Sequence, residues 1–350
     1  MAERSQPPSP DPADMAVCRA LLRRHARSFH AASLLLPRSV REPASVLYGF
    51  CRIADDAVDV PGAGVDRHAA VASLRDRLAR AYEGAPRASA IDRALAAVVA
   101  RHAIPPLLPE RLLEGLAWDA EGRRYETLAD LYDYASRVAG AVGAMMALLM
   151  GVRSADGLAR ACDLGVAMQL SNIARDVAED AAMGRVYLPL AWLREAGIDP
   201  DRWLERPEHN AALESVIRRL LTQADALYAR AAAGIAALPL ACRPGINAAR
   251  LLYAAIGHEV ARDVPRSMRR RAVVTSRRRA WLLARAVTTP WPVATGLDAP
   301  PLASTEAMVR AAATDGMREP HGGAFVVDLF LRLEQRDQRV GGLPTRGALR

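Results

Sequence analysis

Residues 171–180 read SNIARDVAED and directly follow the apolar run GVAMQL. On a helix, Asn172, Asp176 and Asp180 recur every four residues and share one face. Acidic pairs at this spacing destabilise an isolated helix by roughly 0.2–0.5 kcal/mol each, so another interaction must offset their repulsion. The stretch therefore predicts a helix that carries a stripe of oxygen ligands out of a hydrophobic interior.

A second acidic stretch, residues 52–60, reads RIADDAVDV. Asp55 and Asp59 lie one turn apart, about 6 Å along a helix axis, and Asp56 lies beside them. Two such stripes facing each other across a helical bundle would form a cage of hard oxygen ligands. Such a cage suits Mg²⁺, which prefers oxygens at about 2.0–2.1 Å and usually keeps waters or substrate phosphates in its shell.

A single DDxxD pattern on an alanine-rich helix most often marks a solvated face. Here there are two acidic stretches, each flanked by apolar residues and each accompanied by arginines: Arg52 precedes the first, and Arg175 and Arg185 lie within and after the second. Carboxylates as metal ligands together with arginines as phosphate clamps are the combination that departure of a diphosphate requires. The two stretches together favour a functional site.

The rest of the chain has a helical pattern, because alanine, leucine and arginine dominate and β-branched residues rarely cluster. Asp11 followed by Pro12 is typical of a helix start. Pro43 is expected to open another helix, which Pro61 and Gly62 end. We predict an all-α protein, with further helices over residues 66–83, 90–103, 108–121, 127–150, 155–183, 210–237 and 244–262.

The sequence predicts three regions. Residues 1–12 are expected to form a disordered tail, because the first ten are rich in proline and serine. Residues 13–285 are predicted to form one all-α domain, and residues 286–350 a C-terminal extension with one amphipathic helix near 324–338. The apolar run 138–152 is too short to span a membrane and predicts a buried core helix. The N-terminus has no apolar segment typical of a secretory signal.

Composition narrows the chemistry. The 350-residue chain has 47 basic and 39 acidic residues, and every basic residue is arginine, which excludes a Schiff-base lysine and a phosphate loop of the GxxxxGK[ST] type. The net charge of +8 fits nucleic acid, an anionic membrane surface or an anionic small substrate. No nucleic-acid recognition motif is present, so we expect no nucleic-acid partner. Four scattered cysteines without a CxxC pair suggest a reducing, cytoplasmic location.

Several motifs together resemble a known family. YGFCRIADDAVD and QLSNIARDVAED, the latter followed by GRVYLP at 184–189, are similar to the two signatures of the squalene and phytoene synthase family. HARSFH at 25–30 resembles its N-terminal substrate motif, and YASRVAGAVG at 134–143 its central segment. Order and spacing agree over residues 15–275, and the details look most like the bacterial phytoene-forming branch.

The resemblance implies a single-domain isoprenoid synthase bundle with a central cavity. It implies head-to-head condensation of two geranylgeranyl diphosphates to phytoene through a cyclopropyl diphosphate, with release of two diphosphates, in carotenoid biosynthesis. Mg²⁺ or Mn²⁺ would be the cofactor, and no NADPH is expected. Alternatives are a squalene or dehydrosqualene type of synthase that uses farnesyl diphosphate, a terpene cyclase, and a non-catalytic assembly factor related to the family.

The resemblance also implies roles for individual residues. The metal ligands would be Asp55, Asp59, Asn172, Asp176 and Asp180. Diphosphate oxygens, or the water and metal shell, would be held by His25, Arg27, Ser28, Arg52, Gln169, Arg175 and Arg271, with Arg270 fitting almost as well as Arg271. Phe29 belongs to the substrate motif, and Tyr48, Tyr134 and Tyr187 would line the reacting centre. His25 and Phe29 have an alternative interpretation as core residues.

An apolar product implies delivery to a bilayer. We therefore expect a cytoplasmic protein with peripheral contact to the inner membrane, and a downstream desaturase as a partner. The segment near 324–338 or the arginine runs at 269–271 and 277–279 would dock on anionic lipid, although packing of the segment on the protein core is an equal alternative.

Overall fold

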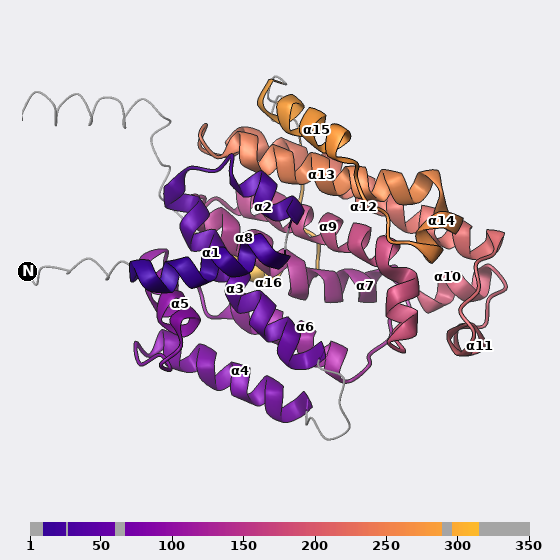
Figure 1. The fold of residues 1–350 in the computed structure, drawn as a ribbon, viewed down its shortest axis with the longest axis horizontal. Helices are drawn as coiled ribbons and strands as arrows, with labels where there is room; N and C mark the ends of the chain where they lie inside the picture. Colours follow the sequence, from indigo (N-terminus) through magenta and orange to yellow (C-terminus); the bar gives the residue numbers. More distant parts are fainter. Residues whose placement is uncertain (1–9, 26, 60–66, 289–295, 315–350) are drawn as a thin grey trace, which may run out of the picture. The chain divides into compact units, whose positions relative to one another are not determined.

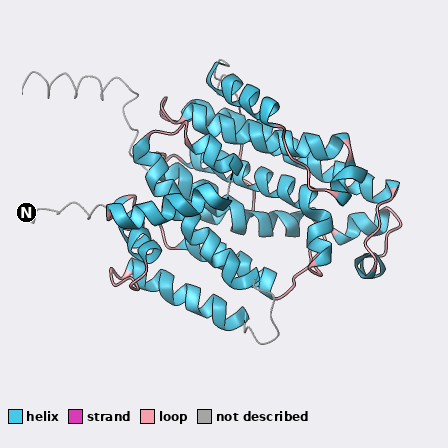
Figure 2. Cartoon of the chain, viewed as in Figure 1, coloured by secondary structure: helices cyan, strands magenta, loops and turns pink. Residues whose placement is uncertain are grey.

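The computed structural model describes residues 10–25, 27–59, 67–288 and 296–314. Within these ranges the chain folds into helices, and no strand is present (Figure 2). The all-α prediction is therefore confirmed. The side chains of His25, Arg27, Ser28, Phe29 and Asp59, the tail at 1–9 and the predicted helix near 324–338 lie outside what the structure describes.

The helices follow one another with short connections. In order they are α1 (Pro12–His25), α2 (Arg27–Ser33), α3 (Arg38–Asp59), α4 (Arg67–Tyr82), α5 (Ala90–Arg101), α6 (Leu107–Ala120), α7 (Leu128–Ala135), the π-helical turn η1 (Ser136–Gly140), α8 (Ala141–Leu149), α9 (Ala155–Ala182), α10 (Leu190–Glu195), α11 (Pro200–Glu205), α12 (Ala211–Ala237), α13 (Arg243–Arg262), α14 (Val264–Arg269), α15 (Ser276–Thr288) and α16 (Glu306–Ala312).

Local sequence signals explain many of the boundaries. The Asp11 carboxylate accepts a hydrogen bond from the amide of Ala13, so α1 begins at Pro12 as predicted. The side chains of Ser154 and Asn210 cap α9 and α12 in the same way. One prediction is wrong: α3 begins at Arg38, and Pro43 lies inside it. Pro43 is the sixth residue of α3, past the first turn, so its missing amide costs the helix one hydrogen bond.

Helix α9 is the central element of the bundle. It packs against α8, η1, α12 and α13, and Figure 1 shows it near the middle of the fold with α13 and α15 above it. Helix α3 packs against α1, α4, α5, α6 and α8. The two helices that carry the acidic stripes are thus both internal elements of one bundle.

Two glycines allow η1 and α8 to approach α9 at backbone distance. A Cβ atom at Gly165 would lie 2.2 Å from the carbonyl oxygen of Ala139, and one at Gly143 would lie 2.2 Å from that of Ala161. Larger side chains at these positions would force the helices apart. The segment at 127–150, predicted as one helix, is divided into α7, η1 and α8 at this contact.

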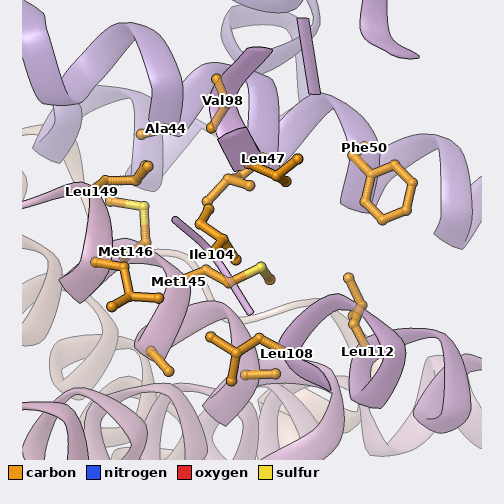
Figure 3. Packing of buried hydrophobic residues seen from close by; sticks show 14 of the residues in the cluster. Ala44, Leu47, Phe50, Val98, Ile104, Leu108, Leu112, Met145, Met146 and Leu149 are labelled. Atoms are coloured by element: carbon orange, nitrogen blue, oxygen red, sulfur yellow. The ribbon is translucent and has the colours of Figure 1, made fainter. Parts of the chain in front are cut away.

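The core beside the site is apolar and densely packed. Figure 3 shows Leu47 and Phe50 of α3 facing Leu108 and Leu112 of α6, with Met145 of α8 between the elements. The residues of α8 are almost all buried, which confirms the buried helix predicted for the run 138–152. In the described ranges no helix is both long and apolar enough to cross a bilayer.

Candidate active site

A cavity of about 260 Å³ runs along α9 and is bounded also by α3, η1, α8, α12 and α13. Its wall is mostly apolar, including Leu47, Val142, Met146 and Leu164. Polar side chains gather where α3, α9 and α13 meet, and these are Tyr48, Gln169, Asn172 and Tyr253. The cavity therefore has one polar end and a long apolar body.

The two acidic stripes continue outward from this polar end. On α3, Tyr48 and Cys51 line the cavity, and Asp55 follows Cys51 by one turn. On α9, Gln169 and Asn172 line the cavity, and Asp176 follows Asn172 by one turn. Residues four apart share a helix face. The structure thus brings both stripes to the same end of the same cavity.

Asn172 has an unusual environment. Its Oδ1 atom is buried, and no hydrogen-bond donor from the described residues reaches it. A buried amide oxygen without a donor is unfavourable by about 1–3 kcal/mol. Because this oxygen belongs to a residue on the cavity wall, it is suited to accept a ligand group or a cation there.

Asp176 is held by two arginines. Arg175 donates to both of its carboxylate oxygens, from Nε at 2.7 Å and from Nη2. Arg271, in the connection between α14 and α15, donates from Nη2 to Oδ2 at 2.8 Å, and its Nε lies 3.8 Å from Glu179. Of the two arginines considered from the sequence, Arg271 is therefore the one that reaches the stripe on α9.

Arg52 occupies the corresponding place on α3. It donates from Nη1 to Asp55 at 3.2 Å and forms a bidentate contact with Asp56 through Nε and Nη2. The neighbouring Tyr48 is half-buried, and burial raises its pKa to about 12, so its hydroxyl stays protonated at neutral pH. Arginine, carboxylate and phenol therefore stand together at the polar end of the cavity.

Asp180 lies at the far end of the α9 stripe. Burial first, and then the nearby carboxylates of Asp176, Asp119 and Glu179, raise its pKa to about 8, while Arg185 opposes them. Asp180 also borders a small pocket with Arg185 and Tyr187. Carboxyl groups from α6 and α9 thus gather at this end of the site.

Tyr134 and Tyr187 converge on Asp119, a residue that our sequence reasoning missed. Their hydroxyls donate to the two carboxylate oxygens at 2.9 and 2.7 Å respectively. The rings stack with centroids 5.2 Å apart, and the ring of Tyr125 stacks on Tyr187 and lies tilted against Tyr134. Burial first and Asp119 second raise the pKa of both phenols. The two tyrosines lie in this cluster, outside the lining of the large cavity.

Tyr253 is a second residue that the sequence reading missed. It lies on the cavity wall from α13, and burial raises the pKa of its hydroxyl while Arg175 and Arg271 lower it. The only sequence signal is an aromatic residue in the alanine-rich stretch LLYAAIGH, which does not distinguish a wall residue from a core residue. Its place at the polar end follows from the packing of α13 against α9.

Some predicted site residues are not placed by the structure. The side chains of His25, Arg27, Ser28, Phe29 and Asp59 lie outside the described residues, so their roles remain predictions. Among the side chains that are described, no group of three His, Cys, Asp or Glu residues converges closely enough to hold a metal ion. The described side chains at the polar end whose oxygens could bind a metal ion are Asp55, Asn172, Asp176 and Asp180, and Gln169 lies next to them.

The fold and this site define a class of all-α proteins in which an apolar cavity ends among carboxylates, amides and arginines. The chain belongs to the squalene/phytoene synthase family, whose family model matches residues 22–279. This confirms the resemblance carried by the sequence motifs.

Relatives in the family cover nearly the whole chain. The phytoene synthase of Rhodobacter capsulatus is 50% identical over 331 residues, which cover 93% of this chain and 97% of that protein. The phytoene synthase of Cereibacter sphaeroides is 49% identical and covers 94% of this chain and 96% of its own length.

Solved structures share the fold. A dehydrosqualene synthase in complex with ligand is similar with a TM-score of 0.70 and 28% identity, covering 79% of this chain and 95% of that chain. The squalene synthase HpnC from Alicyclobacillus acidocaldarius gives a TM-score of 0.65 and 28% identity, covering 71% of this chain and 94% of that chain. The predicted isoprenoid synthase fold is thereby confirmed.

Proposed function

We propose that the protein is a prenyltransferase that joins two geranylgeranyl diphosphates head to head to form phytoene. The observation that carries the proposal is a cavity with an apolar body and a polar end, where both acidic stripes and three arginines meet. Relatives about 50% identical over most of the chain are named phytoene synthase, which supports this product.

The residues present fit a hard divalent cation, Mg²⁺ or Mn²⁺. The metal-binding groups available at the polar end are carboxylate and amide oxygens, and in the described part of the chain no hydrogen-bond donor competes for the buried Oδ1 of Asn172. Asp55, Asn172, Asp176 and Asp180 would hold the metal, together with Asp59 as the family resemblance implies. When bound, the metal would neutralise charge on the leaving diphosphate.

The arginines contribute directly to diphosphate binding. Arg52, Arg175 and Arg271 offer planar sets of N–H donors at the polar end of the cavity, and guanidinium groups bind phosphate oxygens in a bidentate manner. Negative charge that develops on the leaving group is therefore met by fixed positive charge. This arrangement favours cleavage of the allylic carbon–oxygen bond.

The apolar wall protects the carbocation that this cleavage leaves behind. Residues such as Val142, Met146 and Leu164 offer no nucleophile and exclude water from the cavity. The double bond of the second substrate can then attack the cation, and loss of one proton gives a cyclopropyl carbinyl diphosphate. Loss of the second diphosphate, rearrangement and loss of another proton give the linear polyene without a reductant, so the proposal includes no NADPH.

The direct test is product analysis. The purified protein is incubated with Mg²⁺ and, separately, with C15 and C20 all-trans diphosphates without NADPH, and the extracted hydrocarbons are identified by mass spectrometry. A C40 hydrocarbon with a central triene from the C20 substrate, lost in Asp55→Ala and Asp176→Ala, is the expected result. A C30 product would instead favour a dehydrosqualene type of enzyme, and a cyclised monomer would favour a terpene cyclase.

Contact with a membrane is a further part of the proposal, because the product is apolar. Trp281 and Val287 of α15 are exposed, and the guanidinium of Arg285 lies 5.3 Å from the centre of the Trp281 ring. Exposed aromatic and basic side chains on one helix suit an anionic lipid surface. Flotation with anionic liposomes tests this, and unchanged binding of Trp281→Ser would exclude α15 as the contact.

A desaturase that consumes the product is the expected downstream partner.

A further inference from the structure

The segment 296–313, which we call the C-terminal strap, lies beyond the part of the chain that matches the family model. It includes α16, which packs against α6, α8 and α9. Met308, Val309 and Ala312 of this helix are buried in the main core cluster. The strap is therefore an integral part of the helical body, although the sequence reading assigned it to an extension.

Arg160 of α9 fastens the start of the strap. Its side chain is completely buried. Its guanidinium donates hydrogen bonds to four backbone carbonyls of the strap, all within residues 296–300. From Nη1 these are the carbonyls of Gly296, Leu297 and Ala299 at 3.1, 3.2 and 2.8 Å, and from Nη2 that of Pro300 at 3.3 Å.

Asp163 and Arg230 complete this anchor. The Nε of Arg160 lies 2.8 Å from Oδ2 of Asp163, which is also completely buried. Arg230 of α12 donates from Nε to the same oxygen at 3.0 Å and from Nη2 to the carbonyl of Pro300 at 2.7 Å. A buried charge is unfavourable unless it is paired and hydrogen-bonded. The strap carbonyls accept from both Nη atoms of the buried Arg160 guanidinium, so the hydrogen bonds of this group depend on the strap.

Arg160 also lines the cavity, together with Gly157, Ala161 and, on the facing helix α12, Gly234. We call the aliphatic part of its side chain the stem. A Cβ atom at Gly234 would lie 2.4 Å from the Cβ of Arg160, so the stem is packed directly against this glycine. Arg160 precedes Asn172 by twelve residues on the same helix, about 18 Å of axial rise. Arg160 thus stands at the opposite end of the cavity from the polar residues.

We propose that the C-terminal strap, acting through Arg160, closes the apolar end of the cavity and sets the longest prenyl tail that the protein accepts. This inference rests on the proposed function, because it takes the diphosphate to lie at the polar end. A tail that runs from there along α9 meets the Arg160 stem, which cannot retreat while its guanidinium is bound to the strap. If the strap were loosened, the Arg160 side chain could move away and the cavity could accept a longer tail.

Three methionine variants separate the anchor from the cavity lining. Arg160→Met keeps an unbranched stem in the wall but removes all donors to the strap. Arg230→Met weakens the same anchor from a residue that is not on the wall. Arg218→Met is the matched control, because Arg218 lies on the same helix as Arg230, is about half exposed and pairs with Glu214.

Two measurements are made on the full chain with Mg²⁺. Hydrogen exchange of the amides in 302–313 reports whether the strap is loosened. Calorimetric affinities for unreactive C15, C20 and C25 thiolo-diphosphates report tail-length preference without turnover. We expect the wild type and Arg218→Met to bind the C20 analogue well and the C25 analogue weakly. In Arg160→Met and Arg230→Met, exchange should rise and the preference for C20 over C25 should fall about tenfold.

Each other outcome contradicts a defined part of the proposal. Faster exchange with an unchanged preference would show that the strap does not form the end wall, and unchanged exchange in Arg230→Met would refute the anchor. If the wild type bound the C20 and C25 analogues equally well, the proposed limit on tail length would be overturned. If Arg160→Met does not fold, the exchange rates and analogue affinities of Arg230→Met alone test the proposal. Absence of condensation with normal, length-dependent binding would count against the proposed reaction alone.

Discussion

The hydroxyl of Tyr187 donates a hydrogen bond to Oδ1 of Asp119 at 2.7 Å, and Tyr134 occupies the other oxygen of the same carboxylate. Asp119 comes from α6, whereas Tyr187 follows α9 and Tyr134 comes from α7. One carboxylate thereby joins the neighbouring helices α6 and α7 to the segment that follows α9. Because Asp119 also acts on the pKa of Asp180, this junction lies beside the acidic stripe of α9.

Asp119→Ala is expected to reduce turnover by about 10²-fold, because loss of the shared acceptor frees both phenols from their positions near the site. Steady-state kinetics with the C20 diphosphate measure this, and a positioning role predicts a larger effect on kcat than on KM. Tyr228→Phe is the control, since it removes another buried tyrosine hydroxyl, bonded to Ser171, away from Asp119. Equal losses in both variants would indicate a general effect on folding.

Asn172→Leu should weaken binding of Mg²⁺ with diphosphate at least about tenfold, because the amide oxygen proposed as a ligand is replaced by an apolar group of similar size. Asn172→Asp should retain binding. Calorimetric titration of Mg²⁺ in the presence of inorganic diphosphate provides the measurement. Gln223→Leu, an amide on α12 that contacts Tyr132, serves as the control. Unaltered Mg²⁺ affinity in Asn172→Leu would remove this residue from the ligand set.

Gly165→Ala should destabilise the fold by about 1–3 kcal/mol, because the new Cβ would lie 2.2 Å from a backbone carbonyl oxygen and the helices must separate. Gly49→Ala on α3 is the matched control. Its Cβ would meet Ile91 at an ordinary 3.6 Å, so the better helix propensity of alanine should stabilise by about 0.5–1 kcal/mol. Urea unfolding checks both values, and a neutral Gly165→Ala would contradict the close approach.

The free energy of unfolding should fall as the pH decreases below about 6.5, in part because of His102. Burial, and to a smaller extent Arg101 and Arg153, lower the pKa of this side chain in the folded state. The unfolded chain therefore binds the proton more readily, and stability is lost as pH falls through the unfolded value. Urea unfolding between pH 7.5 and pH 5 should show a smaller loss in His102→Leu than in the wild type. Identical losses would assign the effect to other groups.

Most of the fold could be predicted because helical periodicity is a local property. The acidic stripes, the caps at Asp11 and the long helices α9, α12 and α13 follow from residue spacing within one segment. Pro43 led to a wrong boundary for α3, since proline favours the first turn of a helix but here is the sixth residue of the helix. The division of 127–150 at η1 required knowledge of the neighbouring helix.

The sequence by itself determined that the chain is helical, that two helices carry oxygen ligands and that arginines accompany them. The tertiary structure alone decided which partners these groups meet. It selected Arg271 to reach Asp176, joined Tyr134 and Tyr187 at Asp119, placed Tyr253 on the cavity wall and fastened the strap to Arg160. The physical reason is that spacing along a helix specifies which residues share a face, whereas the identity of the opposing face depends on how distant segments pack together.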